Sequence, residues 1–581
     1  MIFFDFEVFK YDWLLVIINP VEKFDYLIVN DPDELKRFYD RYKHDIWCGF
    51  NSKGYDQWIL KGILAGFDPK KINDYIIKEG KPGWGFSSLL RKITLINYDV
   101  MNPLDRGLKT FEGFLGNNIK ESSVPFDIDR KLTEAEIDET ILYCRHDVEQ
   151  TIEVFIRRKE DFEAHMGLIK AFKLPLDYIS KTKVQLSAII LDATKKDHDD
   201  EFEIELPATM RIEKYKEVVR WYENPLNRDY GKELQIDIAG VPHVFAWGGL
   251  HGAIPKYSGE GIYLNVDVAS YYPSLMIEYG YGSRNMSNPD KYREIYHTRL
   301  KYKAEKNPLQ APLKIVLNGT YGAMKDKNNS LFDPRQANNV CVGGQLLLLD
   351  LIEKLEPHCQ IIQSNTDGIL VKLKSIDDYD LIDDIAYEWE QRTKMQLEFD
   401  LYKRIYQKDV NNYLIVDFDG KHKAKGAYVK KLGELDYDLP IVNQAVVNYM
   451  VHNTPVEETI NNCKLLKEFQ KIVKVSSKYS HALYGPTITE EKINGKKVKV
   501  FSGGQIQNEK CFRVFASKNP SDGGIYKVKN EDKNPEKFAN TPEKCFIFNE
   551  NVNDRRVVRQ LDKDWYIEQA RNRLIDFGVL L

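Results

Sequence analysis

The chain has 581 residues, a length that allows about three to five folded domains. A hydrophobic content of 43% and a charged content of 29% exclude an intrinsically disordered chain. No apolar run approaches the roughly 20 residues of a bilayer-spanning helix. The first residues carry acids instead of a basic leader. We therefore predict a cytoplasmic protein without a membrane partner.

The formal net charge of −5 gives no overall support for nucleic-acid binding, so the distribution of charge matters more than its sum. Basic runs occur at 291–306, 421–431 and 492–500, and acids gather at 197–205. Taken alone, such runs are solvated faces in most proteins. The seven cysteines include no CxxC pair, which argues against a zinc ribbon, an iron–sulfur site or a disulfide framework.

Residues 1 to about 190 alternate strand-like and helical segments, as an α/β layer does. In the first strand, FFDFEVF, Asp5 and Glu7 are two residues apart, so both carboxylates point to one face of the strand. Two adjacent carboxylates repel each other unless cations lie between them. A plainer alternative for this pair alone is an exposed position on an edge strand.

Two helical segments of the same region carry further polar residues. GFNSKGYDQWIL places Asp56 at the start of an apolar-periodic helix. TEAEIDETILYCRHDVEQT opens with a capping box of Thr133 and Glu136. Tyr143 and Asp147 follow at i and i+4, on one face of the predicted helix.

Together these three motifs resemble those of DnaQ-like 3′–5′ proofreading exonucleases, in their usual order and kind of spacing. The combination is specific where each motif alone is not. The resemblance implies two Mg²⁺ or Mn²⁺ ions, which generate a hydroxide and stabilise the leaving 3′ oxygen. It assigns these ions to Asp5, Glu7, Asp56 and Asp147, and assigns to Tyr143 the orientation of the attacking water.

After the acidic run we predict a helix near 207–224 and then β-like sequence. GIYLNVDVASYYPSLM indicates a strand that ends in a turn at Tyr272 and Pro273 and leads into a helix. Asp267 is therefore expected at the end of the strand, facing away from the core. A lone acid in such a position is usually a solvated strand end.

The region 291–324 is predicted to be helical and basic. Lys314, Asn318 and Tyr321 form a polar stripe at i, i+4 and i+7, and Arg299 with Lys303 forms an i, i+4 pair upstream. A metal-bound triphosphate needs carboxylates to hold its metal ions and basic side chains to neutralise its phosphates. Cationic helices opposite carboxylates therefore fit such a ligand.

The stretch IIQSNTDGIL, residues 361–370, has the pattern of a β-hairpin with Asp367 at its tip. Near the C-terminus, DWYIEQARNRLIDFG places Ile567, Ala570, Leu574 and Phe577 on one helix face. A packed helix is therefore predicted at the end of the chain.

DVASYYPS, KIVLNGTYG and SNTDG closely resemble motifs A, B and C of family B DNA polymerases. FAWGGLHG is similar to the Gly-Gly motif that joins exonuclease and palm in phage members, and KAKGAYVK to the Lys-rich motif that contacts the primer. These matches run from residue 5 to about 430 in the order of the family. By resemblance, the chain is identified as a compact bacteriophage-type family B DNA polymerase with a proofreading exonuclease.

The resemblance implies a multidomain fold of the α/β and α+β classes, with an RNase H-like exonuclease domain followed by a right-hand polymerase. The expected parts are the exonuclease (1–195), a linker and the start of the palm (196–240), the palm with motif A (241–284), the fingers with motif B (285–324), the palm with motif C and the Lys-rich motif (325–434), and the thumb with the C-terminal region (435–581).

The polymerase resemblance also implies site residues and partners. Two Mg²⁺ or Mn²⁺ ions are assigned to Asp267, Val268 and Asp367, the two aspartates being catalytic. The implied nucleotide-binding residues are Arg299, Lys303 and Lys314 on the triphosphate, Asn318 and Tyr321 along the base pair, and Tyr272 as the steric gate against a 2′-hydroxyl. The expected partners of a monomer are primer-template DNA, single-stranded DNA, dNTPs and replication accessory proteins.

Two positions depart from the family pattern. Asn365 stands where motif C usually has its first aspartate, and Gly319 stands where motif B often has serine. The acid at the first of these positions is a secondary electrostatic contributor, so we expect an active site with an altered rate or ion affinity. The short spacing between motifs favours ordinary primers. The alternatives are a protein-primed phage replicase and a nuclease or DNA-binding protein with an inert polymerase half.

Overall fold

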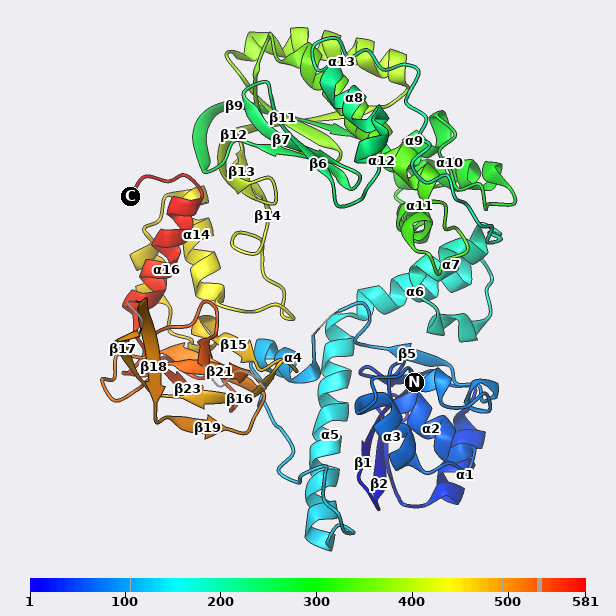
Figure 1. Cartoon of the computed structure of the whole chain (residues 1–581), viewed down its shortest axis with the longest axis vertical. Coiled ribbons are helices and arrows are strands. Elements are labelled where there is room, and N and C mark those ends of the chain that lie inside the picture. Colours follow the sequence, from blue (N-terminus) through cyan, green and yellow to red (C-terminus); the bar gives the residue numbers. More distant parts are fainter. Residues whose placement is uncertain (105, 494–495, 530–534) are drawn as a thin grey trace.

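The computed structural model describes residues 1–104, 106–493, 496–529 and 535–581. It is a mixed α/β multidomain fold built around a five-stranded sheet, a nine-stranded sheet and several small C-terminal sheets. In Figure 1 the nine-stranded sheet lies at the top, the helices α9 to α11 at the right, the N-terminal sheet at the lower right and the C-terminal sheets at the lower left.

The N-terminal sheet has the strand order β3-β2-β1-β4-β5, in which β1 pairs antiparallel with β2 and parallel with β4. The predicted first strand, which carries Asp5 and Glu7, is present as β1. The elements are β1 (Ile2–Val8), β2 (Trp13–Asn19), β3 (Phe24–Val29), α1 (Pro32–Tyr42), β4 (Trp47–Gly49), α2 (Asp56–Leu64), α3 (Pro69–Ile77), β5 (Asn97–Asp99), α4 (Leu108–Leu115) and α5 (Glu134–Arg157).

The alternation of β1 separates an apolar face from an acidic one, as predicted. Phe4, Phe6 and Val8 are buried in the cluster that includes Trp47. The other face carries the carboxylates and lies under α5, which packs on β1 and β2. The predicted capping box of Thr133 is present at the start of α5. Local sequence therefore sets both the polar face of the strand and the start of the helix that covers it.

Two helices at the end of this region, α6 (Lys159–Ala171) and α7 (Lys183–Ile190), pack against α11 (Gln310–Lys325). In Figure 1 they extend away from the five-stranded sheet toward the helices α9 to α11. These two helices thus join the N-terminal part of the chain to the region that carries the predicted motif B.

The helix predicted near 207–224 is much shorter, because only α8 (Lys216–Glu223) forms. The backbone N–H groups of Arg211 and Glu213 donate instead to the carboxylates of Asp350 and Glu353 on α12 (Pro334–Leu355). These bonds satisfy backbone donors that a helix would otherwise pair internally. The segment before Lys216 is therefore held as irregular chain with turns by a helix distant in the sequence.

The acidic run at 197–205 is also more than a solvated face. Asp200 accepts hydrogen bonds from Arg284 and Arg335, and Arg335 also pairs with Glu205. Arg284 pairs in addition with Asp333, whose side chain is fully buried. Hydrogen bonds from Arg284 and Arg335 hold the pKa of Asp200 well below its usual value. The run thus anchors the linker to the helical region.

The central sheet is antiparallel with the order β14-β13-β12-β9-β11-β10-β8-β7-β6. The predicted hairpin is present as β10 and β11, and Asp367 lies in its turn. The elements are β6 (Glu233–Ile238), β7 (Val241–Ala246), β8 (Gly249–Ala253), β9 (Tyr257–Val268), α9 (Tyr271–Glu278), α10 (Pro289–Ala304), β10 (Gln360–Ser364), β11 (Gly368–Leu373), α13 (Tyr379–Thr393), β12 (Leu397–Asp409), β13 (Asn412–Asp417) and β14 (His422–Lys425).

The C-terminal unit combines three helices with small sheets. The predicted face of α16 is confirmed, because Ile567, Ala570, Leu574 and Phe577 are all buried. The elements are α14 (Pro440–His452), α15 (Val456–Asn462), β15 (Lys471–Lys474), β16 (Tyr479–Tyr484), β17 (Thr487–Ile493), β18 (Lys496–Ser502), β19 (Gln505–Gln507), β20 (Cys511–Ala516), β21 (Ile525–Lys529), β22 (Pro535–Lys537), β23 (Cys545–Ile547) and α16 (Lys563–Asp576).

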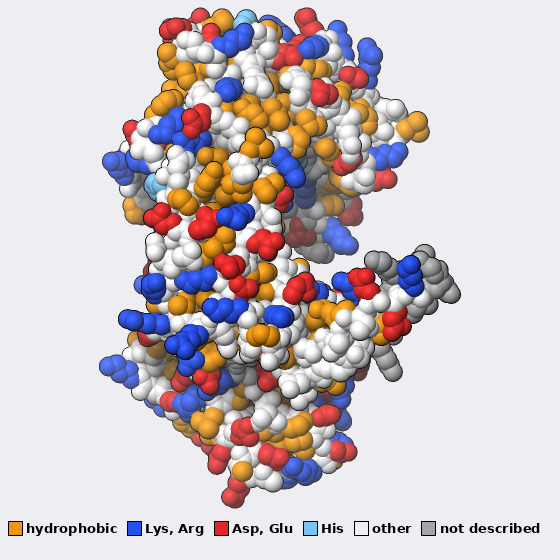
Figure 2. Space-filling view, turned by 90° about the vertical axis from the view of Figure 1, so that its left-hand side faces the viewer, with side chains coloured by type: hydrophobic (Ala, Val, Ile, Leu, Met, Phe, Trp, Pro, Cys, Tyr) orange, Lys and Arg blue, Asp and Glu red, His pale blue; other side chains and the backbone are white. Residues whose placement is uncertain are grey.

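Charged side chains of both signs are mixed over the face of the molecule in Figure 2. The strands β17 and β18 form a two-stranded sheet of their own, and the basic run at 492–500 lies partly outside the described residues. Across the described ranges, no helix combines the length and the apolar character needed to span a membrane. All seven cysteines are free thiols.

Candidate active sites

The first predicted carboxylate set comes together between β1, α2 and α5. Ligand atoms of Asp5, Glu7 and Cys144 lie within 4.8 Å of one another. The backbone N–H of Phe6 donates to Asp56 Oδ1 at 3.2 Å, which ties the start of α2 to β1. Burial, and then repulsion from Asp147 of α5, raises the pKa of Glu7. The structure thus assembles four carboxylates that are distant in the sequence.

Burial dominates the electrostatics of this set. Glu7, Asp56 and Asp147 are only 7%, 2% and 9% exposed. Burial, and then repulsion from Asp56, raises the pKa of Asp5, and burial raises the pKa of Asp56 to about 7. Carboxylates held together out of water favour either protons or cations. Their hard oxygen donors fit Mg²⁺ or Mn²⁺.

Tyr143 lies beside this set, together with two residues that the sequence reasoning missed. Lys109 Nζ lies 2.5 Å from Asp147 Oδ1, 3.1 Å from Glu112 Oε1 and 4.6 Å from the centre of the Tyr143 ring. Glu112 is fully buried. Burial raises the pKa of Tyr143, so its hydroxyl keeps its proton and can donate it in a hydrogen bond. The i, i+3 pair of Lys109 and Glu112 within an apolar helix was the available signal.

The second predicted set forms where β9 ends and β11 begins. Gly368 pairs directly with Asp267, and the Val268 N–H donates to the backbone carbonyl of Asp367 at 2.7 Å. A Cβ atom on Gly368 would lie 1.9 Å from Asp267 Oδ1. The residue after Asp367 must therefore lack a side chain for the Asp267 carboxylate to keep its place.

Asn365, which stands where motif C usually has an aspartate, stabilises the turn around Asp367. Its Oδ1 accepts a hydrogen bond from the Asp367 N–H at 3.2 Å, and its own N–H donates to the Gly368 carbonyl at 2.9 Å. This is the side-chain-to-backbone bond through which Asn and Asp both stabilise turns. The amide of Asn365 thus supports the backbone that presents Asp367, without adding a charge.

The two aspartates of the second set differ in exposure. Burial raises the pKa of Asp267 to about 6, although Asn265 Nδ2 donates to its Oδ2 at 2.6 Å and lowers it. Asp367 is exposed. Two further acids of β12 were missed by the sequence reasoning, since Glu398 pairs with Asp267 across the strands and Asp400 pairs with Asn265. Their spacing of two repeats the pattern of Asp5 and Glu7.

The predicted nucleotide-binding residues fall into two groups. Arg299, 9% exposed, donates to Ser270 Oγ at 3.2 Å, just beyond the end of β9. The rings of Tyr272 and Tyr321 lie 4.4 Å apart between α9 and α11. These residues therefore meet near motif A.

The other group, Lys303, Lys314 and Asn318, lies exposed along α10 and α11. Within the part of the chain that the structure describes, neither Lys303 nor Lys314 contacts Asp267 or Asp367. Neither lysine has a salt-bridge partner there either, and Arg299 has none. The helices α10 and α11 thus carry cationic groups without counter-charges.

The second departure, Gly319, lies where α11 meets α7. A Cβ atom at this position would lie 3.1 Å from Ser187 Oγ, which is tighter than an ordinary contact. Ser187 is fully buried and donates to the Lys183 carbonyl. Glycine therefore lets the two helices approach each other.

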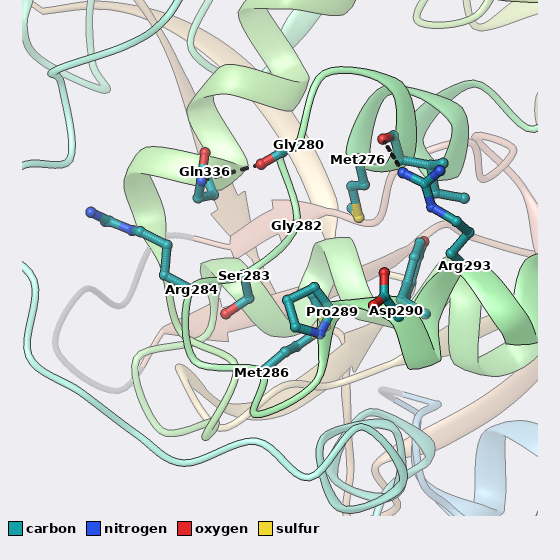
Figure 3. Close-up of a pocket in the computed structure, with 12 residues that line it drawn as sticks. Met276, Gly280, Gly282, Ser283, Arg284, Met286, Pro289, Asp290, Arg293 and Gln336 are labelled. Carbon is teal, nitrogen blue, oxygen red and sulfur yellow. Dashed lines mark hydrogen bonds between the residues drawn. The ribbon is translucent and has the colours of Figure 1, made fainter.

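A cavity of about 240 Å³ is lined by residues of α9, of α10 and of the segment between them, together with Gln336 of α12 (Figure 3), and by no member of either carboxylate set. Arg293 on α10 donates to the Ile277 carbonyl at 3.2 Å, and Gln336 donates to the Gly280 carbonyl at 3.5 Å. These bonds tie the end of α9 to α10 and α12. The lining residues are Met276, Ile277, Gly280, Gly282, Ser283, Arg284, Met286, Pro289, Asp290, Tyr292, Arg293 and Gln336.

No family model matches the chain, and no curated protein matches it. Among solved structures, the chain is similar to the family B DNA polymerase from the hyperthermophilic archaeon Pyrobaculum calidifontis. The similarity covers 100% of this chain and 78% of that chain, at a TM-score of 0.43 and 14% sequence identity. The roles of individual residues are therefore argued from their own contacts.

Proposed function

We propose that the chain is a DNA-directed DNA polymerase that extends a primer 3′-hydroxyl with dNTPs and proofreads with a 3′–5′ exonuclease, in bacteriophage DNA replication. The observation that carries the proposal is the pairing of Gly368 with Asp267, which brings two aspartates from separate motifs to one end of the central sheet. The sequence resemblance to family B polymerases supports the same reading, including monomeric action in the cytoplasm of a host cell.

The donor sets of both sites fit divalent cations. Asp5, Glu7, Asp56 and Asp147 would hold ions at the nuclease site. Asp267 and Asp367 would hold them at the synthesis site, with Val268 beside them through its backbone oxygen. When bound, such ions activate the attacking oxygen and offset the charge that develops on the phosphate.

The residues of the chain have separate tasks at the synthesis site. Lys303 and Lys314, which form no salt bridge among the described residues, would attract and orient the triphosphate together with Arg299, which lies beside Ser270. Tyr272 and Tyr321 form a wall where a sugar and a base pair would lie, and the ring of Tyr272 would exclude a 2′-hydroxyl by steric clash. Asn365 would hold the turn in which Asp367 is presented.

At the nuclease site, the Tyr143 hydroxyl is a donor that would orient a water for in-line attack on a terminal phosphodiester. Lys109, paired with Asp147, offsets part of the charge of the buried carboxylates. The bond that breaks lies between the phosphorus and the 3′ oxygen of the preceding nucleotide, and the water supplies the new oxygen.

A labelled primer on a longer template tests both activities. With Mg²⁺ and all four dNTPs we expect the primer to lengthen, and with Mg²⁺ alone we expect it to shorten. Shortening under both conditions would indicate a nuclease with an inert polymerase half, the alternative that Asn365 motivates. Synthesis that requires a priming protein instead of a free 3′-hydroxyl would indicate a protein-primed replicase.

A further inference from the structure

Helix α4 belongs to the N-terminal part of the sequence but packs between two units. It contacts α5 on one side and the strands β15 and β20 of the C-terminal unit on the other. Figure 1 shows α4 on the side of α5 that faces β15, whereas β1 and β2 lie on the opposite side. This helix therefore lies between the proposed nuclease site and the C-terminal unit, and Cys511 Sγ of β20 also donates to the Lys109 carbonyl at 3.4 Å.

The nuclease side of α4 presents a single ammonium group to buried acids. Lys109 Nζ pairs with Asp147 Oδ1 at 2.5 Å and with Glu112 Oε1 at 3.1 Å. Glu112 is fully buried, and Asp147 is 9% exposed. A small shift of α4 that withdraws Lys109 would leave Asp147 of α5 buried without its cation, which is costly, whereas Glu112 lies on α4 and would move with Lys109.

The other end of α4 is capped by side chains of the C-terminal unit. The last four carbonyl groups of an α-helix have no partner within the helix. Here Arg513 Nη2 donates to the carbonyls of Glu112 and Gly113 at 3.4 and 3.1 Å. Gln470 donates to the Phe114 carbonyl at 3.1 Å, and Lys467 donates to the Leu115 carbonyl at 2.8 Å. All four carbonyls thus accept bonds from the C-terminal unit.

Arg513 is the centre of this cap. Its side chain is fully buried, and its Nη2 also reaches the Asn117 carbonyl at 2.8 Å. Its Nη1 and Nε are fixed within the C-terminal unit by the Glu550 carbonyl at 2.6 Å and Gln470 Oε1 at 3.0 Å. A cation at the C-terminal end of a helix is favoured by the helix dipole. The several N–H donors of the forked Arg513 guanidinium thus hold α4 against the C-terminal unit.

We infer that the C-terminal unit controls the nuclease site through this cap, with Arg513 as a positioning residue that holds Lys109 against Asp147. The inference rests on the proposed nuclease function of the first carboxylate set. Movement of the C-terminal unit away from α4 would withdraw Lys109 from the acids. Among the described residues, Arg513 forms no hydrogen bond or salt bridge with a residue of the synthesis site, so we expect this control to act on degradation alone.

Three variants test the inference in the full-length protein. Arg513→Lys keeps the charge but loses the fork, and Gly113→Ala places a Cβ atom 2.9 to 3.1 Å from three side-chain atoms of Ile472, which wedges α4 away from β15. Lys109→Met removes the ammonium itself. The matched control is Lys563→Gln, because Lys563 caps the carbonyls of Ile460, Asn461 and Cys463 within the C-terminal unit without touching α4.

We expect Arg513→Lys and Gly113→Ala to lower kcat for single-strand degradation by about tenfold, the effect of roughly 1.4 kcal/mol. The KM for the strand and the rate of single-nucleotide addition should stay within about twofold of wild type, as should all rates of Lys563→Gln. The double variant of Lys109→Met with Arg513→Lys should be no slower than Lys109→Met alone, because both changes remove the same contact. Effects that multiply, or a wild-type kcat in Arg513→Lys, would overturn the inference.

A second readout does not depend on activity. With Asp267 and Asp367 both changed to Ala, Mn²⁺ bound by the protein reports the nuclease carboxylates, and electron paramagnetic resonance measures the free ion. Loss of the Lys109 charge should tighten Mn²⁺ binding by about threefold in Lys109→Met and in Arg513→Lys alike. If wild type neither binds Mn²⁺ there nor degrades DNA, the proposed nuclease function fails. If it does both and Arg513→Lys matches it, only the inference fails.

Discussion

The two carboxylate sets differ in how the repulsion between their adjacent negative charges is offset. The nuclease set gathers four acids in a buried site and supplies a cation of its own, Lys109. The synthesis set has two acids at one end of the inner strands β9 and β11 of the central sheet, and Asp367 is exposed. Burial raises the pKa values of all four nuclease acids and also that of Asp267, whereas Asp367 is open to water and to a ligand that can screen its charge.

This difference follows from the elements that carry the acids. The nuclease acids lie under α5 and beside α4, so the fold itself excludes water from them. The synthesis acids lie on a strand end and a hairpin turn, and among the described residues Lys303 of α10 and Lys314 of α11 form no salt bridge. On the proposed function, the first site needs only its ions, and a bound triphosphate would link the acids of the second site to these two lysines.

Removal of one synthesis acid should have the largest effect. Asp367→Ala should lower primer extension by about 1,000-fold or more, the scale expected when a group that stabilises transition-state charge is lost. Degradation of the same primer without dNTPs should continue at the wild-type rate. The exposed acid of the following turn gives a control, Asp377→Ala, which should keep both activities. Equal loss of degradation in Asp367→Ala would show that the two sets are not independent.

Removal of nuclease acids should abolish degradation without affecting synthesis. Asp5→Ala combined with Glu7→Ala should reduce primer degradation by about 1,000-fold and leave extension intact, because both lost carboxylates belong to the nuclease set. The measurement is the shortening of a labelled primer without dNTPs. Degradation that survives this double change would place the nuclease elsewhere in the chain.

A methyl group should damage the open site through geometry alone. Gly368→Ala would bring a Cβ atom to 1.9 Å from Asp267 Oδ1, so the carboxylate must move. A displacement of about 1 Å at a reacting group costs about 100-fold in rate, so extension should fall by this factor. Gly433→Ala is the control, since its Cβ would make only an ordinary contact at 3.4 Å. A wild-type rate of extension in Gly368→Ala would show that the pairing of Gly368 with Asp267 does not set the position of the Asp267 carboxylate.

Local sequence predicted much of this architecture because the relevant signals are local. The alternation in β1, the hairpin tip at Asp367, the capping box at Thr133 and the apolar face of α16 all depend on residues a few positions apart. The predicted helix over 207–224 was wrong in its first half, because Asp350 and Glu353 bind that segment from a helix about 140 residues away.

The residues missed at the sites have the same explanation. Lys109 and Glu112 matter only because α4 folds back onto α5, and the sequence does not show this contact. Glu398 gains its position from a strand register with Asp267 across more than 100 residues. The assignment of exonuclease, palm, fingers and thumb remains a prediction from resemblance.

Acidity should affect the buried set first. Burial raises the pKa of Asp56 to about 7 and that of Asp267 to about 6, and in both cases the ionised form binds the cation. Cation affinity should therefore fall as the pH drops through about 7 at the nuclease site and through about 6 at the synthesis site. At low Mg²⁺, the ratio of degradation to extension should fall about fivefold between about pH 8 and pH 6. If the ratio of degradation to extension instead rose as the pH fell, the buried carboxylates would not be the nuclease site.

The smallest effect should come from Asn365. Asn365→Ala removes the bond that its Oδ1 accepts from the Asp367 N–H, worth about 1 kcal/mol, so extension should fall about fivefold. Asn224→Ala is the matched control, because the exposed Asn224 accepts the same kind of bond from the Leu226 N–H and belongs to neither carboxylate set. A loss as large as that of Asp367→Ala would mean that Asn365 takes part in the chemistry. A modest loss of extension would mean that the synthesis site depends on the hydrogen bonds that fix the turn at Asp367, whereas the nuclease site depends on the helices that pack beside it.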